Sequence, residues 1–432
     1  VLPDNRHLIL KTSREENIAA MEALRPGDGA SFRQTMQEME ADAELIFGLL
    51  GNRPWSLATV KLLFNQLRKR GLAGLASFVG GTLGNSREWL ENHFQSQQIH
   101  ALLAPWILHT GLGPESSFSG AMNRLIAFTL EQAGMPIVKG GSSRLVEAFE
   151  GLIRSNNGEL LTGVHVEQVL VERSQAVGVH SADGREFAAR RAVICNVTPT
   201  QLYGQLLEPA CVPKVVQQET REYRYGRADM QIHLALAEPP QWIAPELNKV
   251  VMLHLTPGLD AVSKAVNEAE RGLLPECATI VLAQPTAIDP SRAPEGKWVL
   301  WIQLQELPTL IKGDASGEIN TPADGLWNDT IKNQYADRII ARIEQHIPNL
   351  RQAIIGRAVL SPVDLETMNI NLVGGDPYSG HCGVNQFFLW RPLKSVKNYS
   401  TPVKNLYHIG ASTHPGPGLA GSSGYLLAKQ LA

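Results

Sequence analysis

The chain has 432 residues, of which 44% are apolar and 19% charged, and its formal net charge is −3. Such a composition is typical of a folded globular protein rather than a disordered one, and the near-neutral charge argues against a nucleic-acid partner. The length allows two or three domain-sized units, and no apolar run approaches the roughly 18 residues that a membrane-spanning helix needs.

The first third of the chain has the residue spacing of helices. Ser13 and Glu16 form a capping box, in which a hydroxyl and a carboxylate satisfy the first free N–H groups of a helix. A short strand is expected at residues 8–10. Helices are expected over residues 13–24, from Asp28 or Ser31 to Leu50, and over residues 54–133, with breaks at Gly80-Gly81 and at residues 111–114. This part is therefore predicted to be a helical insertion.

Residues 60–79 form a basic amphipathic segment within that region. Its cations are Lys61, Arg68, Lys69 and Arg70, and leucine, phenylalanine and valine lie between and after them. Such a helix most often packs its apolar side on its own domain, and less often lies on a membrane surface. Both interpretations stay open at this point.

The middle of the chain changes from helix to strand. Residues 135–149 contain a glycine pair, a serine cap and apolar residues at helical spacing. Strands are then expected over residues 161–171, 176–180 and 192–196, and Asp183-Gly184 indicates a hairpin turn.

An antiparallel sheet is expected next, because several alternating apolar segments are separated by glycine and proline turns. The expected strands cover residues 228–237, 249–255, 279–283 and 298–305. A helix follows over residues 325–347, and Pro348 ends it. The polar, glycine-rich loop at residues 369–383 is of the kind in which functional residues tend to gather, although it is equally suited to a surface connection.

The C-terminal thirty residues carry the most informative pattern. An apolar strand at residues 406–409 runs into a loop with Gly410, Gly416, Gly418 and Gly421, and a helix follows. The last three glycines remove Cβ atoms where another body must come close, and the helix directs its unpaired N–H groups toward the loop. We therefore expect a seat for an electron-rich or anionic ligand, since an ordinary turn needs only one glycine.

Residues 410–421 resemble the C-terminal flavin signature of phytoene-desaturase-like FAD flavoproteins, in the branch of pyridine nucleotide-disulfide oxidoreductase domain-containing proteins. Residues 135–149 are similar to the Pro…Gly-Gly…Leu segment of that family. The resemblance implies a mixed α/β (α+β) fold, in which an incomplete Rossmann-like FAD-binding domain is interleaved with an antiparallel-sheet substrate domain and a helical insertion. The implied divisions are a helical substrate-side region at 1–133, FAD-binding segments at 134–205 and 396–432, and a substrate-binding domain at 206–395.

The same resemblance implies the site residues. FAD is the expected cofactor and no metal is expected. His414 is the candidate catalytic residue, although a histidine that merely fixes the geometry of the loop is an equal alternative. Tyr378 and His381 are candidates for the substrate pocket. The residues expected to bind the cofactor are Val166, through its main chain, and Gly410, Pro415, Gly416, Gly418, Leu419 and Gly421.

One expected feature of a FAD protein is missing from these residues. No strand followed by Gly-x-Gly-x-x-Gly and a helix is present to hold the pyrophosphate. Three explanations are open: the sequence is a piece of a longer one, the dinucleotide half resides on another chain, or the protein is a relative that has lost FAD. The first explanation is favoured because the C-terminal glycine pattern is retained.

The predicted function is that of a FAD-dependent oxidoreductase of the desaturase or dehydrogenase type, which takes a hydride from a C–H or C–N bond of an organic, apolar small molecule. The alternatives are a flavin amine oxidase and a non-enzymatic scaffold or partner subunit. The widely spaced cysteines at 195, 211, 277 and 382 indicate buried free thiols and a cytoplasmic or other reducing compartment. Peripheral membrane contact and homo-oligomerisation stay open.

Overall fold

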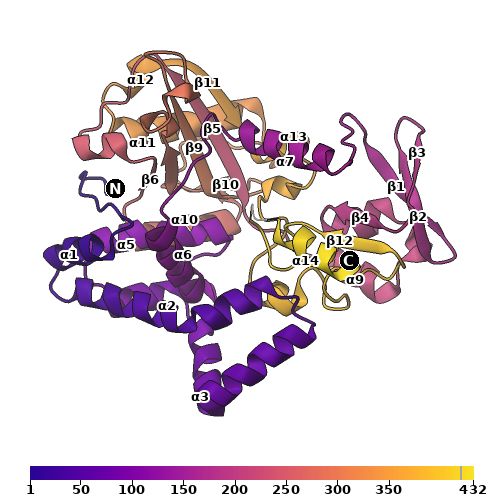
Figure 1. Cartoon of the computed structure of the whole chain (residues 1–432). Coiled ribbons are helices and arrows are strands. Elements are labelled where there is room, and N and C mark those ends of the chain that lie inside the picture. The colour runs from indigo at the N-terminus through magenta and orange to yellow at the C-terminus, as the bar shows by residue number, and fades with distance from the viewer. Residues whose placement is uncertain (419–420) are drawn as a thin grey trace. The chain divides into compact units, whose positions relative to one another are not determined.

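The computed structural model describes residues 1–418 and 421–432 (Figure 1). The chain forms two compact units, each built from three separate segments. Unit 1 comprises Val1–Met39, Gly81–Gly158 and Arg227–Gly375, and unit 2 comprises Glu40–Gly80, Glu159–Gly226 and Asp376–Ala432. Helix α2 (Asp28–Gly51) contributes residues to both units.

Unit 1 is built on a five-stranded antiparallel sheet with the strand order β11-β5-β9-β8-β6. These strands are β5 (Ala228–Leu236), β6 (Met252–Leu255), β8 (Ile280–Ala283), β9 (Trp298–Leu307) and β11 (Ile354–Leu360). The helices are α1 (Arg14–Leu24), α4 (Ser86–His93), α5 (Gln97–Leu103), α6 (Ser119–Ala133), α7 (Ser143–Ser155), α10 (Leu259–Glu270), α11 (Asp329–Glu344), α12 (Leu350–Ala353) and α13 (Pro362–Met368). Two further short strands of this unit, β7 (Leu273–Leu274) and β10 (Gly313–Asp314), pair in parallel.

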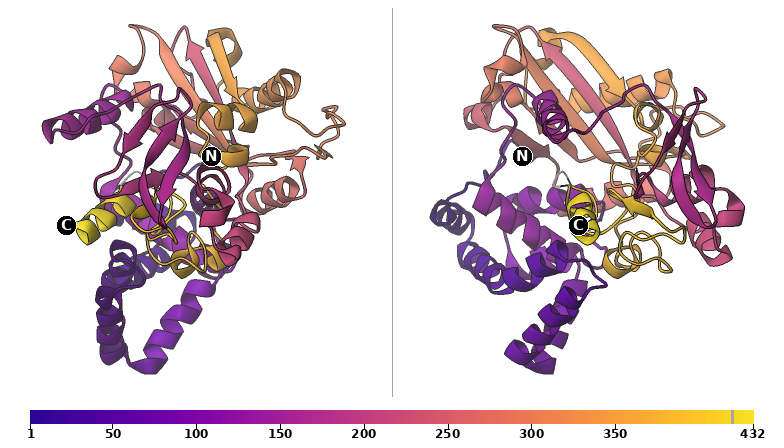
Figure 2. Two further views of the ribbon diagram at one scale, coloured as in Figure 1. Left: turned by 90° about the vertical axis from the view of Figure 1, so that its right-hand side faces the viewer. Right: turned by 45° about the vertical axis from the view of Figure 1, so that its right-hand side comes forward.

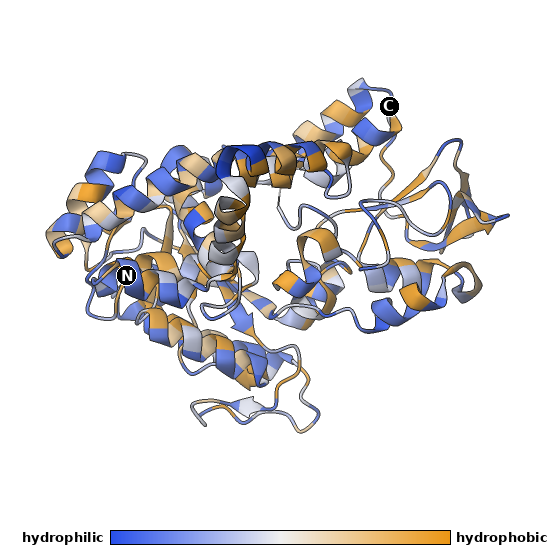
Figure 3. Cartoon of the chain, turned by 90° about the horizontal axis from the view of Figure 1, so that it is seen from below, coloured by the Kyte–Doolittle hydropathy of each residue, from blue (hydrophilic) through white to orange (hydrophobic). Residues whose placement is uncertain are grey.

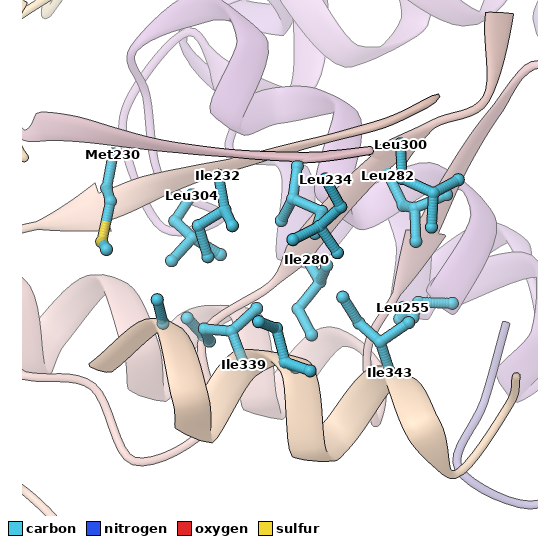
Figure 4. Packing of buried hydrophobic residues seen from close by; sticks show 14 of the residues in the cluster. Met230, Ile232, Leu234, Leu255, Ile280, Leu282, Leu300, Leu304, Ile339 and Ile343 are labelled. Carbon is cyan, nitrogen blue, oxygen red and sulfur yellow. The ribbon is translucent and has the colours of Figure 1, made fainter. Parts of the chain in front are cut away.

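Strand alternation places the core of unit 1 on one face of this sheet. Ile232 and Leu234 of β5 point toward Ile339 and Ile343 of α11, and all four side chains are buried (Figure 4). Asn328 caps the start of helix α11, because its side chain accepts a hydrogen bond from the N–H of Ile331. A local capping signal and an apolar stripe therefore together fix where this helix lies on the sheet.

Unit 2 contains the strands of the candidate cofactor region. The antiparallel sheet consists of β1 (Val166–Glu172), β2 (Gln175–Ser181) and β3 (Glu186–Ala188), and the parallel pair consists of β4 (Val193–Asn196) and β12 (Leu406–Ile409). Its helices are the C-terminal part of α2, α3 (Leu57–Leu83, as far as Gly80), α8 (Pro199–Gln201), α9 (Lys214–Arg221) and α14 (Ser422–Leu431). Helix α14 packs beside β12 through Leu426 and Leu427 (Figure 2).

The predicted fold class is confirmed, and so are most predicted elements. Ser13 caps α1 by accepting from the N–H of Glu16, but the predicted capping box is only half formed, because the Glu16 carboxylate accepts from Nζ of Lys11 instead. The strands expected over residues 228–305 are present and antiparallel. The strand expected at residues 8–10 is wrong, because these residues join no ladder of the described sheets and a strand needs a paired neighbour. Strand β11 had not been predicted.

Two predictions about helix ends were also wrong. Helix α3 continues through Gly80-Gly81 to Leu83, since both glycines keep helical torsion angles, and the kink lies instead at Gly71, with φ of 70°. Ser142 precedes α7 but its side chain makes no capping hydrogen bond. The boundaries of the two compact units differ from those of the functional divisions expected from the sequence. Those functional divisions stay a prediction.

Candidate active site

The C-terminal loop begins where the parallel strands β4 and β12 end. Gly410 follows β12 with φ of 106°, and a Cβ atom there would lie 2.1 Å from Oδ1 of Asn196, the last residue of β4. The N–H of Gly410 donates to Oγ of Ser423 at 3.0 Å, which ties the strand end to the first turn of α14. Gly410 is therefore required by the protein's own packing, independently of any ligand.

The other loop glycines divide into two kinds. A Cβ atom at Gly416 would lie 2.9 Å from the ring of Phe387, whereas one at Gly418 or Gly421 would have no atom of another described residue within 4 Å. Gly421 precedes α14 in the left-handed conformation, and no side chain caps the helix among the described residues. Gly418 and Gly421 are thus open main-chain positions, Gly421 lies beside uncapped N–H groups, and these two residues fit an anionic or planar group. Leu419 lies outside the described residues.

His414 lies in this loop but is 1% exposed. Its ring meets the ring of Phe388 edge-on, with centroids 5.4 Å apart, and neither ring nitrogen has a hydrogen-bond partner among the described residues. Burial lowers the pKa of His414 to about 4, and main-chain carbonyls of Asn52, Leu50 and Leu49, which face the ring, partly oppose this shift. The catalytic role of His414 stays a prediction.

A second buried histidine, His408, supports the same loop from β12. Its Nε2 lies 2.7 Å from the carbonyl oxygen of Val197 and 3.1 Å from Oγ of Ser412, and Ser412 also donates to that carbonyl. Burial lowers the pKa of His408 to about 4, which the Val197 carbonyl partly opposes. A neutral imidazole here joins the end of β4 to the start of the loop.

Because of His408 and His414, we expect the folded protein to lose stability in acid. Because an unfolded histidine titrates near 6.5 and the folded ones near 4, the unfolded chain binds more protons between these pH values. The free energy of unfolding should therefore be intact above pH 6.5 and fall by roughly 3 kcal/mol per histidine as the pH drops to 4. Replacing His414 by leucine should reduce the slope of stability against pH in this window, and an unchanged slope would contradict the assignment.

The polar loop at residues 376–383 is organised around a buried carboxylate. Asp376 is fully buried and accepts three main-chain hydrogen bonds of 2.8 Å, from Gly226, Tyr378 and Gly380. Burial raises the pKa of Asp376, and these three N–H donors and the charge of Arg391 partly oppose the shift. The loop is therefore a defined structure rather than a loose surface connection.

Arg391 brings the two loops together. Its guanidinium donates to the carbonyl oxygens of Tyr378 at 2.8 Å, His381 at 3.4 Å and Ala411 at 2.8 Å. The candidate pocket residues Tyr378 and His381 are thus joined to the glycine loop within unit 2. Sequence reasoning missed Arg391 and Asp376, although a single arginine inside the apolar run at residues 387–393 was a signal of a buried cation.

Val166 occupies a different part of unit 2. It is the first residue of β1 and pairs with Ser181 of β2, and the carbonyl of the preceding His165 accepts a hydrogen bond from Ala182 at 2.9 Å. Nothing described joins Val166 to the C-terminal loop. Its expected main-chain contact with the adenine of FAD stays a prediction, as do the ligand contacts expected of Pro415 and the loop glycines.

A parallel strand pair that feeds a glycine-rich loop and an uncapped helix, together with a separate antiparallel sheet, is the arrangement expected above for a flavin-dependent oxidoreductase. A family model described as flavin containing amine oxidoreductase matches residues 21–416. The chain belongs to this family, and the predicted family is confirmed.

Among its relatives are two mammalian proteins named pyridine nucleotide-disulfide oxidoreductase domain-containing protein 2. The chain is 27% identical to the mouse protein, covering 87% of this chain and 65% of that one, and 25% identical to the rat protein, covering 97% and 75%. A lycopene-forming phytoene desaturase of Paracoccus sp. is 27% identical, covering 76% of this chain and 63% of the enzyme. The chain thus spans about two thirds of the length of these relatives.

Two solved structures share the fold. An oxidoreductase from Methanosarcina mazei aligns with a TM-score of 0.52 and 15% identity, covering 83% of this chain and 72% of that one. A putrescine oxidase variant aligns with a TM-score of 0.52 and 13% identity, covering 94% and 76%.

Proposed function

We propose that this chain is the substrate-binding and C-terminal cofactor-binding part of a FAD-dependent oxidoreductase of the desaturase or dehydrogenase type. The observation that carries the proposal is the open main chain at Gly418 and Gly421 beside the uncapped start of α14. A flavin, when bound, supplies an acceptor for a hydride from a C–H or C–N bond of a small organic substrate. Flavin amine oxidation is the alternative within the same class.

The chain's own residues would bind the cofactor and orient the substrate. Gly418 and Gly421 would let a planar or anionic group approach the main chain, and the first N–H groups of α14 would face its negative charge. The loop around Asp376 would hold Tyr378 and His381 toward the substrate, and the packing of the half-buried Phe388 on the buried His414 would exclude water.

The test is the absorption spectrum of the purified full-length gene product. We expect flavin bands that bleach under anaerobic conditions when a substrate is added, and we would compare a long polyene with a primary amine. A polyene that bleaches the flavin supports the desaturase type, and an amine that does so supports the amine oxidase. A colourless full-length protein that stays so after incubation with FAD would leave the non-enzymatic scaffold as the better description.

The expected compartment and assembly remain proposals. Within residues 1–418 and 421–432, no helix is long and apolar enough to cross a bilayer. The cysteines at 195, 211, 277 and 382 are free, as expected, although only Cys195 and Cys382 are buried. We propose a reducing compartment on that basis, and homo-oligomerisation stays open.

A specific observation favours peripheral membrane contact. On α3, the buried side chains Thr59 and Gln66 are polar, whereas Leu57 and Phe64 are 88% and 56% exposed on the other side of the helix. Apolar residues therefore face outward, the reverse of an ordinary surface helix. Residues 57–83 contain four basic and no acidic residues, and Figure 3 shows the mixture of apolar and polar residues along the helices of the chain. We propose that this face lies on an anionic lipid surface.

Sedimentation with lipid vesicles tests this contact. Replacing Lys61 and Arg68 by alanine should weaken binding to phosphatidylserine-containing vesicles by roughly fivefold per cation, and high salt should remove the difference. Replacing Leu57 and Phe64 by serine should weaken binding to all vesicles. Leu152→Ser on α7 is the matched control, since Leu152 is 59% exposed on a helix whose Arg154 is paired with Glu150.

Wild-type vesicle binding by all α3 variants would overturn the membrane proposal. So would a change from dimer to monomer, measured by light scattering of the same variants without lipid, because that result would make a second copy of the chain the partner of this face.

A further inference from the structure

Arg391 is a buried cation whose hydrogen-bond partners are neutral: three main-chain carbonyl oxygens and, at 3.9 Å, Sγ of Cys382. Arg391 is 2% exposed, and its Nε and Nη2 both donate to the carbonyl oxygen of Ala411, at 3.0 and 2.8 Å. Nη2 also donates to Tyr378, and Nη1 donates to His381. Burying a guanidinium is unfavourable unless its donors are satisfied, so this arrangement indicates a specific role.

The two loops that Arg391 contacts are otherwise anchored to different elements. Asp376 and Tyr223 hold the loop at residues 376–383, because Tyr223 donates to the carbonyl of Ser379 at 2.8 Å and Asp376 binds the N–H of Gly226. The glycine loop is held by β12, Ser423 and the pair His408 and Ser412. A shift of either anchor would change the distance between the loops, and Arg391 opposes that shift.

We infer that Arg391 is a positioning residue, which sets the spacing between the candidate substrate residues Tyr378 and His381 and the glycine loop at Ala411. The inference rests on the proposed function, since it assigns substrate to one loop and cofactor to the other. Arginine suits this role because its planar group reaches three carbonyl oxygens in different directions, whereas lysine presents its donors from a single atom. Small errors in the placement of substrate against cofactor slow a reaction strongly.

The test compares Arg391→Lys with Arg391→Met in the full-length protein. In protein stripped of flavin, amide hydrogen exchange at residues 376–383 and 411–416 should quicken at least tenfold in both variants. With flavin bound, Arg391→Lys should lower kcat for flavin reduction at least tenfold, while KM and the flavin content stay within twofold of wild type. The matched control is Arg338→Lys, which disturbs another partly buried guanidinium, bonded to Asp314 at 2.7 Å in unit 1.

These measurements distinguish a failure of the positioning role of Arg391 from a failure of the proposed function. Wild-type exchange rates in Arg391→Lys and Arg391→Met, or a loss of kcat in Arg391→Lys that merely follows flavin content or is matched by Arg338→Lys, would overturn the positioning role. A wild-type protein that binds no flavin would instead overturn the proposed function, and the exchange measurement would still report whether Arg391 holds the loops together.

Discussion

Gly380→Ala should be one of the most damaging single-methyl additions in unit 2. Gly380 has φ of 136°, and an added Cβ atom would lie 1.9 Å from the hydroxyl oxygen and 2.6 Å from Cζ of the buried Tyr223. A side chain at such a φ costs about 1 to 2 kcal/mol, and overpacking against a buried ring costs about 1 to 3 kcal/mol. We expect the free energy of unfolding to fall by about 2 to 5 kcal/mol, measured by urea denaturation.

A double-mutant cycle separates these two causes. Tyr223→Leu removes the ring atoms that approach Gly380 but leaves its torsion angle strained, so Gly380→Ala should be about 1 to 3 kcal/mol less damaging in that background. Gly151→Ala is the control, because Gly151 lies in helix α7 with nothing within 4 Å of an added Cβ, and alanine there should stabilise slightly. Equal effects in both backgrounds would show that the contact with Tyr223 is unimportant.

Local signals explain what the sequence predicted well. Ser13 and Glu16 are three residues apart, so their capping interaction was readable before any fold was known. The alternation along β5 and β9 likewise follows from each strand alone. Strand β11 was missed because Gly356 and Arg357 interrupt its apolar pattern, and its place beside β5 depends on pairing with a segment more than a hundred residues away.

Much of the candidate site could not be predicted, because it depends on contacts between residues that are far apart in the sequence. The glycine pattern of the C-terminal loop was recognised, but it did not reveal that Asn196 and Phe387 fill the space beside Gly410 and Gly416 while Gly418 stays open. The main-chain carbonyls that face His414 come from the end of α2 and from Asn52 directly after it, far away in sequence. A main-chain carbonyl or N–H group has no side-chain identity, so the partners of Arg391 and Asp376 could not be predicted from residue types.

Asp376→Ala should destabilise unit 2 about as strongly as Gly380→Ala, through lost hydrogen bonds rather than a clash. The substitution leaves the N–H groups of Gly226, Tyr378 and Gly380 without their acceptor in a buried loop. Each buried, unsatisfied group costs about 1 to 3 kcal/mol, so the three together should lower the free energy of unfolding by about 3 to 9 kcal/mol, measured by urea denaturation. Faster hydrogen exchange at residues 376–383 should accompany this loss, since the loop has then lost its organising group.

Asparagine at position 376 distinguishes hydrogen bonding from size. An amide oxygen at the position of Oδ2 can still accept from Gly226 and Gly380, whereas the amide nitrogen would face the N–H of Tyr378. Stability should therefore decrease in the order wild type, Asp376→Asn, Asp376→Ala. Asp324→Ala is the control, because Asp324 is exposed and accepts one main-chain hydrogen bond, from Leu326 at 3.0 Å. If Asp376→Ala were no more damaging than this control, the buried carboxylate would not be what orders the loop that carries Tyr378 and His381.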